Sequence, residues 1–520
     1  MSEDNKDDEN FAPEPSPTDN LHEYYVKTDP SKMILGAFIP SILQNILATF
    51  SYLLSYSIQT LYFGDQTIYS YASFMPIWFI FAILVPCSAA EVTALQYAKL
   101  IGRRAAVDEF QQFFARSIWV MALSGVLGSA MSLGMSVVLF GRLHASPTYR
   151  LFYYVWSALY PLLVAFSFGP NFWFRTENRK FLIFCRFSYQ FVTQLLIEYA
   201  LYYLFAPSSP WPTLVALIAS FSLTTAWQVF LIKEKTIFSI LVRYVVRFDL
   251  GLCKALFVPQ TWLVEAKAIF LPFIDIFFRV AAQSGEAAAV LICLHFASQY
   301  EDKFYQFATY LDLTLYYMFG ALFKIVGNTL YQVILTPIHV NFSILQYNRT
   351  LEIVKKALTW YVILTAVIAL VFYFIFSQLA SFLTFNQDDQ THNLTFLYFR
   401  DYRAHLGIIA IVTTVSNSLE GLIMTALAFS GLDSNRFYPL SLLLVRVGIA
   451  VYGGAQLMTE VGEFAQFGYV LLFANCGAAI CGVLWLAFYV VKFKLVWKEK
   501  RQRKKVSLDE EMAKMKEEEE

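Results

Sequence analysis

The segment from Lys32 to Gln59 reads KMILGAFIPSILQNILATFSYLLSYSIQ, and it decides the class of the protein. It contains no Asp or Glu, and its polar and apolar residues do not alternate as they do in a half-buried strand. The hydrocarbon core of a bilayer is about 30 Å thick, and a helix of about 20 apolar residues crosses it. The segment is therefore predicted to span a membrane as a helix.

The rest of the 520-residue chain repeats this pattern. Most of its apolar stretches are too long for strands of a soluble protein, and a helix satisfies its own backbone hydrogen bonds in lipid. We predict an all-α membrane protein with 12 transmembrane helices, at about 33–60, 67–97, 113–141, 151–170, 181–205, 211–232, 264–297, 304–335, 357–379, 404–431, 437–459 and 464–491.

The composition agrees with this class and excludes others. Hydrophobic residues make up 58% of the chain and charged residues 15%, against about 25% charged in soluble domains. Lys+Arg and Asp+Glu both number 39, so no basic excess points to a nucleic-acid partner. The six cysteines lie in or beside apolar runs without metal-ligand spacing. No resident metal or other cofactor is expected.

The distribution of basic residues predicts the orientation. Lys and Arg concentrate on alternate loops, for example at 103–104, at 179–180 and in the long connector 233–263. The positive-inside rule places these loops in the cytosol, together with both termini. We predict that the acidic segment 1–31 is a disordered cytosolic tail and that 492–520 is a charged cytosolic tail.

Three pairs of short matches occur in the same order before and after the connector. They are FIPSIL (38–43) with FLPFID (270–275), RRAAVDEFQQFF (103–114) with RTLEIVKKAL (349–358), and FRTENRKF (174–181) with FSGLDSNRF (429–437). Such duplications are common in transporters, with the substrate site between the repeats. We predict two pseudo-symmetric lobes of six helices, at 32–232 and 264–491, joined by a cytosolic linker at 233–263.

The pattern resembles the multidrug and toxic compound extrusion (MATE) family, within the multidrug/oligosaccharidyl-lipid/polysaccharide (MOP) flippase superfamily. The segment SNSLEGLIMTAL (416–427) is similar to helix ten of plant and animal members, and AFSGLDSNR from Ala428 is similar to the turn that follows it. The resemblance covers about 33–491. It implies a transporter of small organic solutes. The first span lacks the acidic residue of bacterial members, and Val280 stands where animal members have Glu.

Ionisable side chains inside the membrane are costly, so they are expected to face one another, bases or water. Glu420 is the first candidate for ion coupling or substrate binding. Asn417 and Glu420 lie on one helical face with Thr413 and Met424, which places the carboxylate on a polar stripe. The alternative is a structural ion pair between Glu420 and Arg446.

The predicted span 264–297 supplies a second polar face. Asp275, Arg279, Gln283 and Glu286 lie on it. Asp275 and Arg279 are four residues apart and are expected to neutralise each other. Glu286 has no such local partner, and we rank it above Asp275 as a candidate.

Further candidates are less specific. Asp312 and Lys324 are expected to share the polar interior, and Gln44 lies on a neutral face of the first span with Ser51, Ser55 and Gln59. Glu91 is expected to extend to the membrane surface. A row of Arg186, Gln190, Gln194 and Glu198 is predicted to hold neighbouring helices together.

The leading hypothesis is a secondary active transporter, an antiporter that exports organic, cationic solutes in exchange for H⁺ or Na⁺ by alternating access. It requires a chamber between the lobes, and it would lose its basis if every carboxylate were paired with a base and no chamber existed. The alternative is a flippase for lipids or lipid-linked oligosaccharides, with Arg279, Lys324 and Arg186 at an anionic headgroup.

An integral-membrane enzyme is the third hypothesis, and it is disfavoured because the six histidines show no paired spacing. We therefore expect a protein that is not an enzyme. The expected partners are a small organic solute and membrane lipid, the expected state is a monomer, and the expected location is the plasma membrane or a vacuolar or lysosomal membrane.

Overall fold

The structure is a computed structural model, and every element in its described part is a helix. The described residues are 19–63, 65–140, 147–205, 209–233, 262–299, 306, 309, 310, 313, 324–383, 437–459, 467, 469–485, 487 and 488.

The first half of the chain forms a short helix followed by a bundle of long helices. Asp29 caps the first long helix, because its Oδ2 accepts the Lys32 amide at 3.0 Å, and that helix begins at Pro30. The elements are α1 (Asp19–Lys27), α2 (Pro30–Phe63), α3 (Asp65–Ile77), the π-helical segment η1 (Trp78–Leu84), α4 (Val85–Arg103), α5 (Val107–Phe140), α6 (Pro147–Thr176), α7 (Lys180–Phe205) and α8 (Trp211–Lys233).

The second half has its own long helices. They are α11 (Trp262–Ala297), α13 (Ile325–Ser343), α14 (Tyr347–Leu383), α17 (Phe437–Thr459) and the helix Tyr469–Trp485. Two arms of α11, Ala266–Ala281 and Gln283–Ala297, meet at an angle of 48°. The predicted span 304–335 is described at 306, 309, 310, 313 and from 324 onward, and α13 continues past its predicted end to Ser343. The predicted span 404–431 lies outside the described residues.

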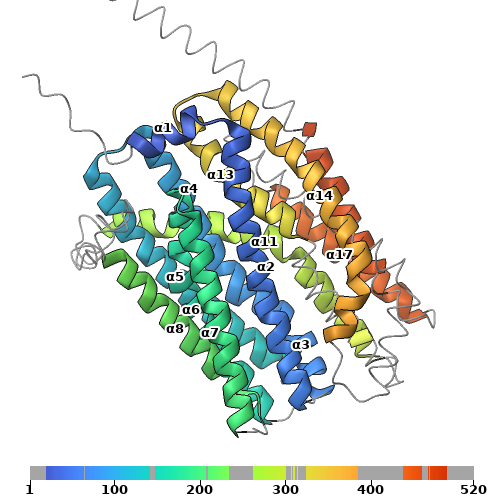
Figure 1. Ribbon diagram of the computed structural model, residues 1–520. Helices are drawn as coiled ribbons and strands as arrows, with labels where there is room; N and C mark the ends of the chain where they lie inside the picture. The colour runs from blue at the N-terminus through green and yellow to red at the C-terminus, as the bar shows by residue number, and fades with distance from the viewer. Residues whose placement is uncertain are drawn as a thin grey trace, which may run out of the picture.

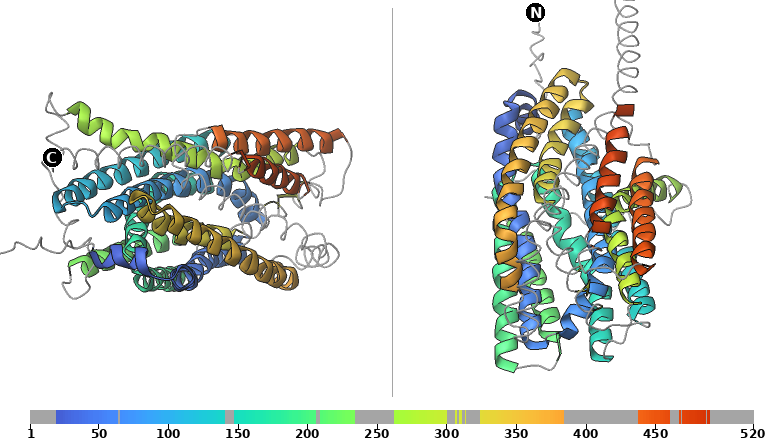
Figure 2. Two further views of the ribbon diagram at one scale, coloured as in Figure 1. Left: turned by 90° about the horizontal axis from the view of Figure 1, so that it is seen from above. Right: turned by 90° about the vertical axis from the view of Figure 1, so that its right-hand side faces the viewer.

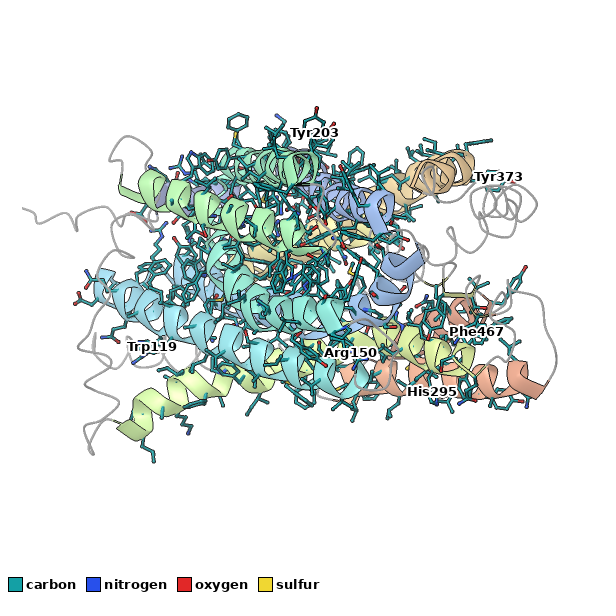
Figure 3. All side chains as sticks on the ribbon, turned by 90° about the horizontal axis from the view of Figure 1, so that it is seen from below. Trp119, Arg150, Tyr203, His295, Tyr373 and Phe467 are labelled. Carbon is teal, nitrogen blue, oxygen red and sulfur yellow. The ribbon has the colours of Figure 1, made fainter. Side chains whose placement is uncertain are left out.

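The bundle carries the surface expected of a multi-pass membrane protein. Six of the described helices are long and apolar enough to cross a membrane, or seven if the two arms of α11 form one span. Large apolar side chains on the outside are exposed, among them Phe181 (72%) and Tyr203 (72%). Tyr203 lies at the outer rim of the bundle in Figure 3. Such a surface is stable in lipid and unfavourable in water.

The two halves occupy opposite sides of the bundle. In Figure 1, α5, α6, α7 and α8 lie on one side, α14 and α17 lie on the other, and α2 and α11 run between them. Contacts between the halves are made by α13 with α2 and α4, by α14 with α2, and by α11 with α3, η1, α4 and α5. The helix Tyr469–Trp485 ends at the same end of the bundle as α1 (Figure 2). We call this end the α1 end.

Three chain reversals at the α1 end use one hydrogen-bonding pattern. Arg104 (φ 52°), Asn178 (φ 62°) and Leu345 (φ 61°) have left-handed backbones. In each case the next amide donates to the carbonyl five residues earlier: Ala105 to Leu100, Arg179 to Phe174 and Gln346 to Asn341. This is the Schellman ending of a helix. The reversals after α4 and α13 therefore match, at equivalent points of the two predicted repeats.

Helix α1 corrects the prediction that 1–31 is a disordered tail, for the described residues 19–31. It lies across helix ends from both halves. Tyr25 donates through its hydroxyl to the Thr176 carbonyl of α6 at 2.8 Å, and Asn341 of α13 donates to the Tyr25 carbonyl at 3.1 Å. Composition did not reveal this helix, because its stability comes from these tertiary contacts rather than from a long apolar run.

The α1 end is closed by direct contact between the halves. A Cβ atom added at Gly102 of α4 would lie 2.7 Å from the Val340 carbonyl oxygen of α13 and would also meet Ser343. Only a glycine allows the two helices to approach this closely. Further along the interface, Asn45 of α2 donates to Thr329 Oγ1 of α13 at 2.8 Å.

Candidate functional site

A cavity of about 240 Å³ lies between the two halves. Its wall from the first half consists of residues of α2, α3, η1 and α6, and its wall from the second half consists of residues of α11 and α13. We call it the central chamber; it is lined by Asn45, Ala48, Thr49, Tyr52, Leu53, Met75, Trp78, Phe79, Ile83, Tyr160, Val164, Glu286, Lys324, Ile325, Asn328 and Gln332.

Glu286 and Lys324 are the charged residues among those that line the central chamber. They form an ion pair between Glu286 Oε2 and Lys324 Nζ. The Glu286 side chain is 3% exposed and that of Lys324 is 19% exposed. The prediction that Glu286 faces the interior is consistent with this position, and the base that it contacts comes from the start of α13 rather than from a neighbouring turn of α11.

Aromatic rings form much of the opposite wall. The Tyr52 and Tyr160 hydroxyls are 2.6 Å apart. The Trp78 ring lies 5.1 Å from that of Tyr52, edge to face, and 4.9 Å from that of Tyr160. Packed rings of this kind are rigid, and their faces attract cations. The chamber thus places a ring wall from the first half opposite a charged pair from the second.

A second ion pair links the halves nearer the α1 end. Arg279 Nη1 of α11 lies 2.5 Å from Glu91 Oε1 of α4, and it donates to the Tyr331 hydroxyl of α13 at 2.9 Å. Tyr331 in turn donates to Glu91. These contacts correct two expectations, because Glu91 is buried instead of extending to the surface and Arg279 pairs with Glu91 in addition to any contact with Asp275.

The structure separates the other predicted site residues. Asp275 is exposed and lies in a different cavity, of about 450 Å³, with Lys99, Arg103 and Arg116. Gln44 is buried inside the first half, where its Oε1 accepts from Arg175 Nη2 at 3.2 Å. Neither residue lines the central chamber. Glu420, Asn417 and Asp312 lie outside the described residues.

The polar face predicted for the first span faces the helices of its own half. Ser55 donates to Glu198 Oε1 of α7 at 2.8 Å, and Gln59 donates to Thr213 of α8 at 3.0 Å. Thr213 also donates to Glu198 at 2.6 Å. Glu198 therefore holds α2, α7 and α8 together, as the row on α7 was predicted to do.

The polar residues of α2 that line the chamber are Asn45, Thr49 and Tyr52, and none of them is among the site residues predicted from the sequence. They are spaced by four and three residues, which is the signature of one helical face. Side-chain polarity alone favours the face of α2 that carries Gln44 as the predicted site. The packing of α2 against α13 shows instead that the face with Asn45 meets the other half. Among the described residues, no three His, Cys, Asp or Glu gather as a metal site requires.

Solved structures show which fold this is. A MOP superfamily transporter from Pyrococcus furiosus superposes with a TM-score of 0.70 at 13% identity, and a multidrug resistance MATE family transporter in an outward-facing conformation does so with 0.69 at 12%. A MATE in complex with MaL6 gives 0.67 at 14%. Each match covers 91% of this chain and 98% of the other.

No protein-family model matches the sequence, and no curated protein matches it. The structural matches show that the chain has the fold of the MATE transporters of the MOP superfamily. Their sequence identity of 12–14% establishes the fold alone. The resemblance drawn from the sequence is confirmed at this level.

Proposed function

We propose that the protein is a membrane transporter, an antiporter that exports organic, cationic solutes in exchange for H⁺ or Na⁺ by alternating access between its two halves. The observation that carries the proposal is the central chamber, where a buried carboxylate faces a wall of aromatic rings across the interface of the halves. A carboxylate attracts a cation over long range, and ring faces add about 0.5–2 kcal/mol each at contact. A bulky organic cation fits this combination.

The proposal assigns roles to the predicted residues. Glu286 binds the solute cation and the coupling ion alternately during the transport cycle. Glu420, with Asn417, remains the proposed second acidic site, and Asp312 a proposed member of the same polar interior. Asp275 and Gln44 are not proposed, because they lie away from the chamber. The α1 end is proposed to be cytosolic, in the plasma membrane or a vacuolar or lysosomal membrane, with the protein acting as a monomer surrounded by lipid.

The flippase alternative is not favoured. An anionic headgroup requires unneutralised basic groups, but Lys324 and Arg279 are each paired with a carboxylate, and Arg186 is buried within the first half, where it donates to Ser167. The P. furiosus neighbour has a binding pocket of reversed polarity, which suggests a different function for that transporter. Within this fold, the solute class must accordingly be inferred from the residues of each chamber.

The test is transport by the full chain reconstituted in vesicles. Uptake of a fluorescent organic cation is measured under an imposed H⁺ gradient and, separately, an imposed Na⁺ gradient. The wild type is expected to respond to one of them, and Glu286→Gln is expected to lose at least about tenfold of the driven rate, because the buried charge that holds the cation is gone.

Glu109→Gln is the matched control, since Glu109 is an exposed acid in the first turn of α5, and it should transport like the wild type. The double variant Glu286→Gln/Lys324→Gln removes both charges and separates loss of transport from loss of folding, because it leaves no unpaired charge. Undiminished driven transport by Glu286→Gln would refute the role of Glu286.

A further inference from the structure

The cavity of about 450 Å³ that contains Asp275 lies at the α1 end, outside the central chamber. Its described wall consists of the last turns of α4 and the first turns of α5, from the first half, and of the first arm of α11, from the second. The lining residues recur every three or four positions, as Lys99 and Arg103 do on α4 and Gln112 and Arg116 do on α5. Each helix therefore contributes one face to the cavity.

Basic side chains gather in this cavity. The charged members of its described lining are Lys99, Arg103, Arg116, Glu109 and Asp275. Three bases against two acids leave a net charge of +1. The segment 233–263, which leads into α11, has five bases and two acids in its sequence, so its own charge has the same sign. We call this cavity the basic cavity.

A base that contacts a carboxylate can still bind a second anion. A guanidinium group has five N–H donors, and a bidentate contact with a carboxylate uses two of them. Arg103 and Arg116 can each hold a phosphate oxygen with the donors that remain, and the Lys99 ammonium adds a compact positive charge. Binding of an anion thus does not require any of the three bases to be unpaired.

The length of the basic cavity indicates an amphipathic ligand. From Glu109 to Val120, its α5 wall extends over about 17 Å of helix, whereas the headgroup layer of a bilayer is only roughly 5–8 Å thick. All three helices also contribute apolar side chains, among them Leu100, Phe113 and Leu271. The cavity therefore offers contacts both to a charged headgroup and to the apolar part of the same molecule.

The α11 wall of the basic cavity continues into a surface that suits lipid. Leu271 lines the cavity and is 55% exposed, and its neighbour Phe270 is 58% exposed. Val264 and Phe277 on the same arm are exposed as well. Large apolar side chains that are exposed on a membrane-spanning helix contact lipid, so a lipid molecule can reach the cavity from the side.

We propose that the basic cavity binds the phosphate headgroup of an anionic membrane lipid. Arg103, Arg116 and Lys99 hold the phosphate, and the acyl chains lie along the apolar surface of α11 beside Leu271. The α1 end is the end proposed to be cytosolic, and the cytoplasmic leaflet contains anionic lipids that attract Lys and Arg. The lipid is a bound ligand and not the transported solute, because it lies outside the central chamber. The inference does not depend on the proposed transport activity.

The test is binding of phosphatidylglycerol to the purified full chain in detergent, titrated and counted by native mass spectrometry. Phosphatidylcholine with the same acyl chains is the comparison, since it has the same phosphate but no net charge. The wild type is expected to bind phosphatidylglycerol at least about fivefold more tightly, with an affinity that falls as salt is added. Equal affinity for the two lipids would overturn the proposal.

Arg103→Gln/Arg116→Gln removes two of the three bases. The affinity for phosphatidylglycerol is expected to fall about 25-fold, at about fivefold for each base near the membrane surface. Lys355→Gln/Lys356→Gln makes the same change in total charge at exposed sites on α14 and is expected to bind the lipid like the wild type. An equal loss in both double variants would overturn the proposal, because the lipid would then respond to total charge and not to this cavity.

Asp275→Asn tests the basic cavity in the opposite direction, and a misfolded protein cannot imitate its result. Removing one acid raises the net charge of the described lining from +1 to +2. Phosphatidylglycerol is therefore expected to bind about fivefold more tightly than it does to the wild type. Unchanged or weaker binding would contradict the proposal.

Glycerol 3-phosphate, which has a phosphate but no acyl chains, distinguishes a lipid from a soluble phosphate. It is expected to displace phosphatidylglycerol only at a large excess, because it lacks contacts with the apolar lining. If it binds as tightly as the lipid does, the cavity takes a soluble phosphate and the assignment to lipid is wrong. Vesicle transport is measured separately: loss of transport with lipid binding intact counts against the proposed function alone, and the reverse result counts against the present inference alone.

Discussion

Glu91 and Glu286 are buried on different helices, and each contacts a base from another element. Glu91 of α4 lies against Arg279 of α11, and Glu286 of α11 lies against Lys324 at the start of α13. A buried pair of this kind adds little net stability, but removing one partner leaves a charge without compensation. The two pairs differ in location. The pair of Glu91 and Arg279 joins the two halves, whereas the pair of Glu286 and Lys324 lies within the second half and faces the central chamber.

Arg279→Gln is expected to destabilise the protein by about 3–5 kcal/mol, because Glu91 is then left charged and buried. Glu91→Gln/Arg279→Gln is expected to recover most of this loss. Thermal unfolding of the single and double variants in one detergent measures both effects. If the two single effects simply add in the double variant, the residues are not coupled and the prediction is wrong.

The sequence identified several of these residues without their partners. Glu286 and Lys324 were recognisable because ionisable side chains are rare in apolar spans. Their pairing was not, since it depends on where the start of α13 lies relative to α11, which a local sequence pattern does not specify. The predicted stripe from Asp275 to Glu286 assumes one straight helix, whereas the two arms of α11 meet at 48°, and Asp275 and Glu286 lie in different cavities.

Helix α1 is placed to restrict movement of the two halves relative to each other. It contacts α4 and α13, and Arg349 of α14 donates to the Thr28 carbonyl just beyond it. Burial raises the pKa of the Tyr25 hydroxyl well above its usual range, so the group remains a hydrogen-bond donor to Thr176 at physiological pH. Helix α1 therefore holds ends of both halves together at the α1 end.

Deleting residues 19–27 is expected to let the α1 end open more often, because contacts between α1 and both halves are lost. Spin labels at positions 103 and 356, on helices of opposite halves, would show a broader distance distribution than in the full chain. Tyr25→Phe removes one hydrogen bond, worth about 0.5–1.5 kcal/mol, and should give a smaller change in the same direction. Identical distributions in all three proteins would contradict this role of α1.

The whole molecule was predicted more fully than its site. The apolar segments were sufficient to predict an all-α membrane protein, because a bilayer constrains length and composition strongly. The resemblance to the MATE family came from the short repeats and from the segment 416–427, and the solved structures confirm it for the fold. Helix α1 was missed, and the chamber face of α2 was assigned to the neighbouring face. Both errors concern contacts between segments distant in the sequence, which local patterns do not specify.

Alternating access requires the halves to move relative to each other, and a covalent link between them should stop it. Asn45 of α2 and Thr329 of α13 are in contact across the interface. In a background without the native cysteines, Asn45→Cys/Thr329→Cys is expected to lose vesicle transport on oxidation and regain it on reduction. Each single cysteine variant is the control. Transport that persists with the disulfide formed would exclude movement at this point of the interface.

Both halves contribute to the lining of the central chamber, since Tyr52, Trp78 and Tyr160 come from one half and Glu286 and Lys324 from the other. In the proposed transporter, a bound solute therefore contacts both halves at once. The affinity for a solute that contacts both surfaces falls as the two halves move apart. The affinity would then depend directly on the angle between the halves. Widening that angle would be sufficient to release the solute.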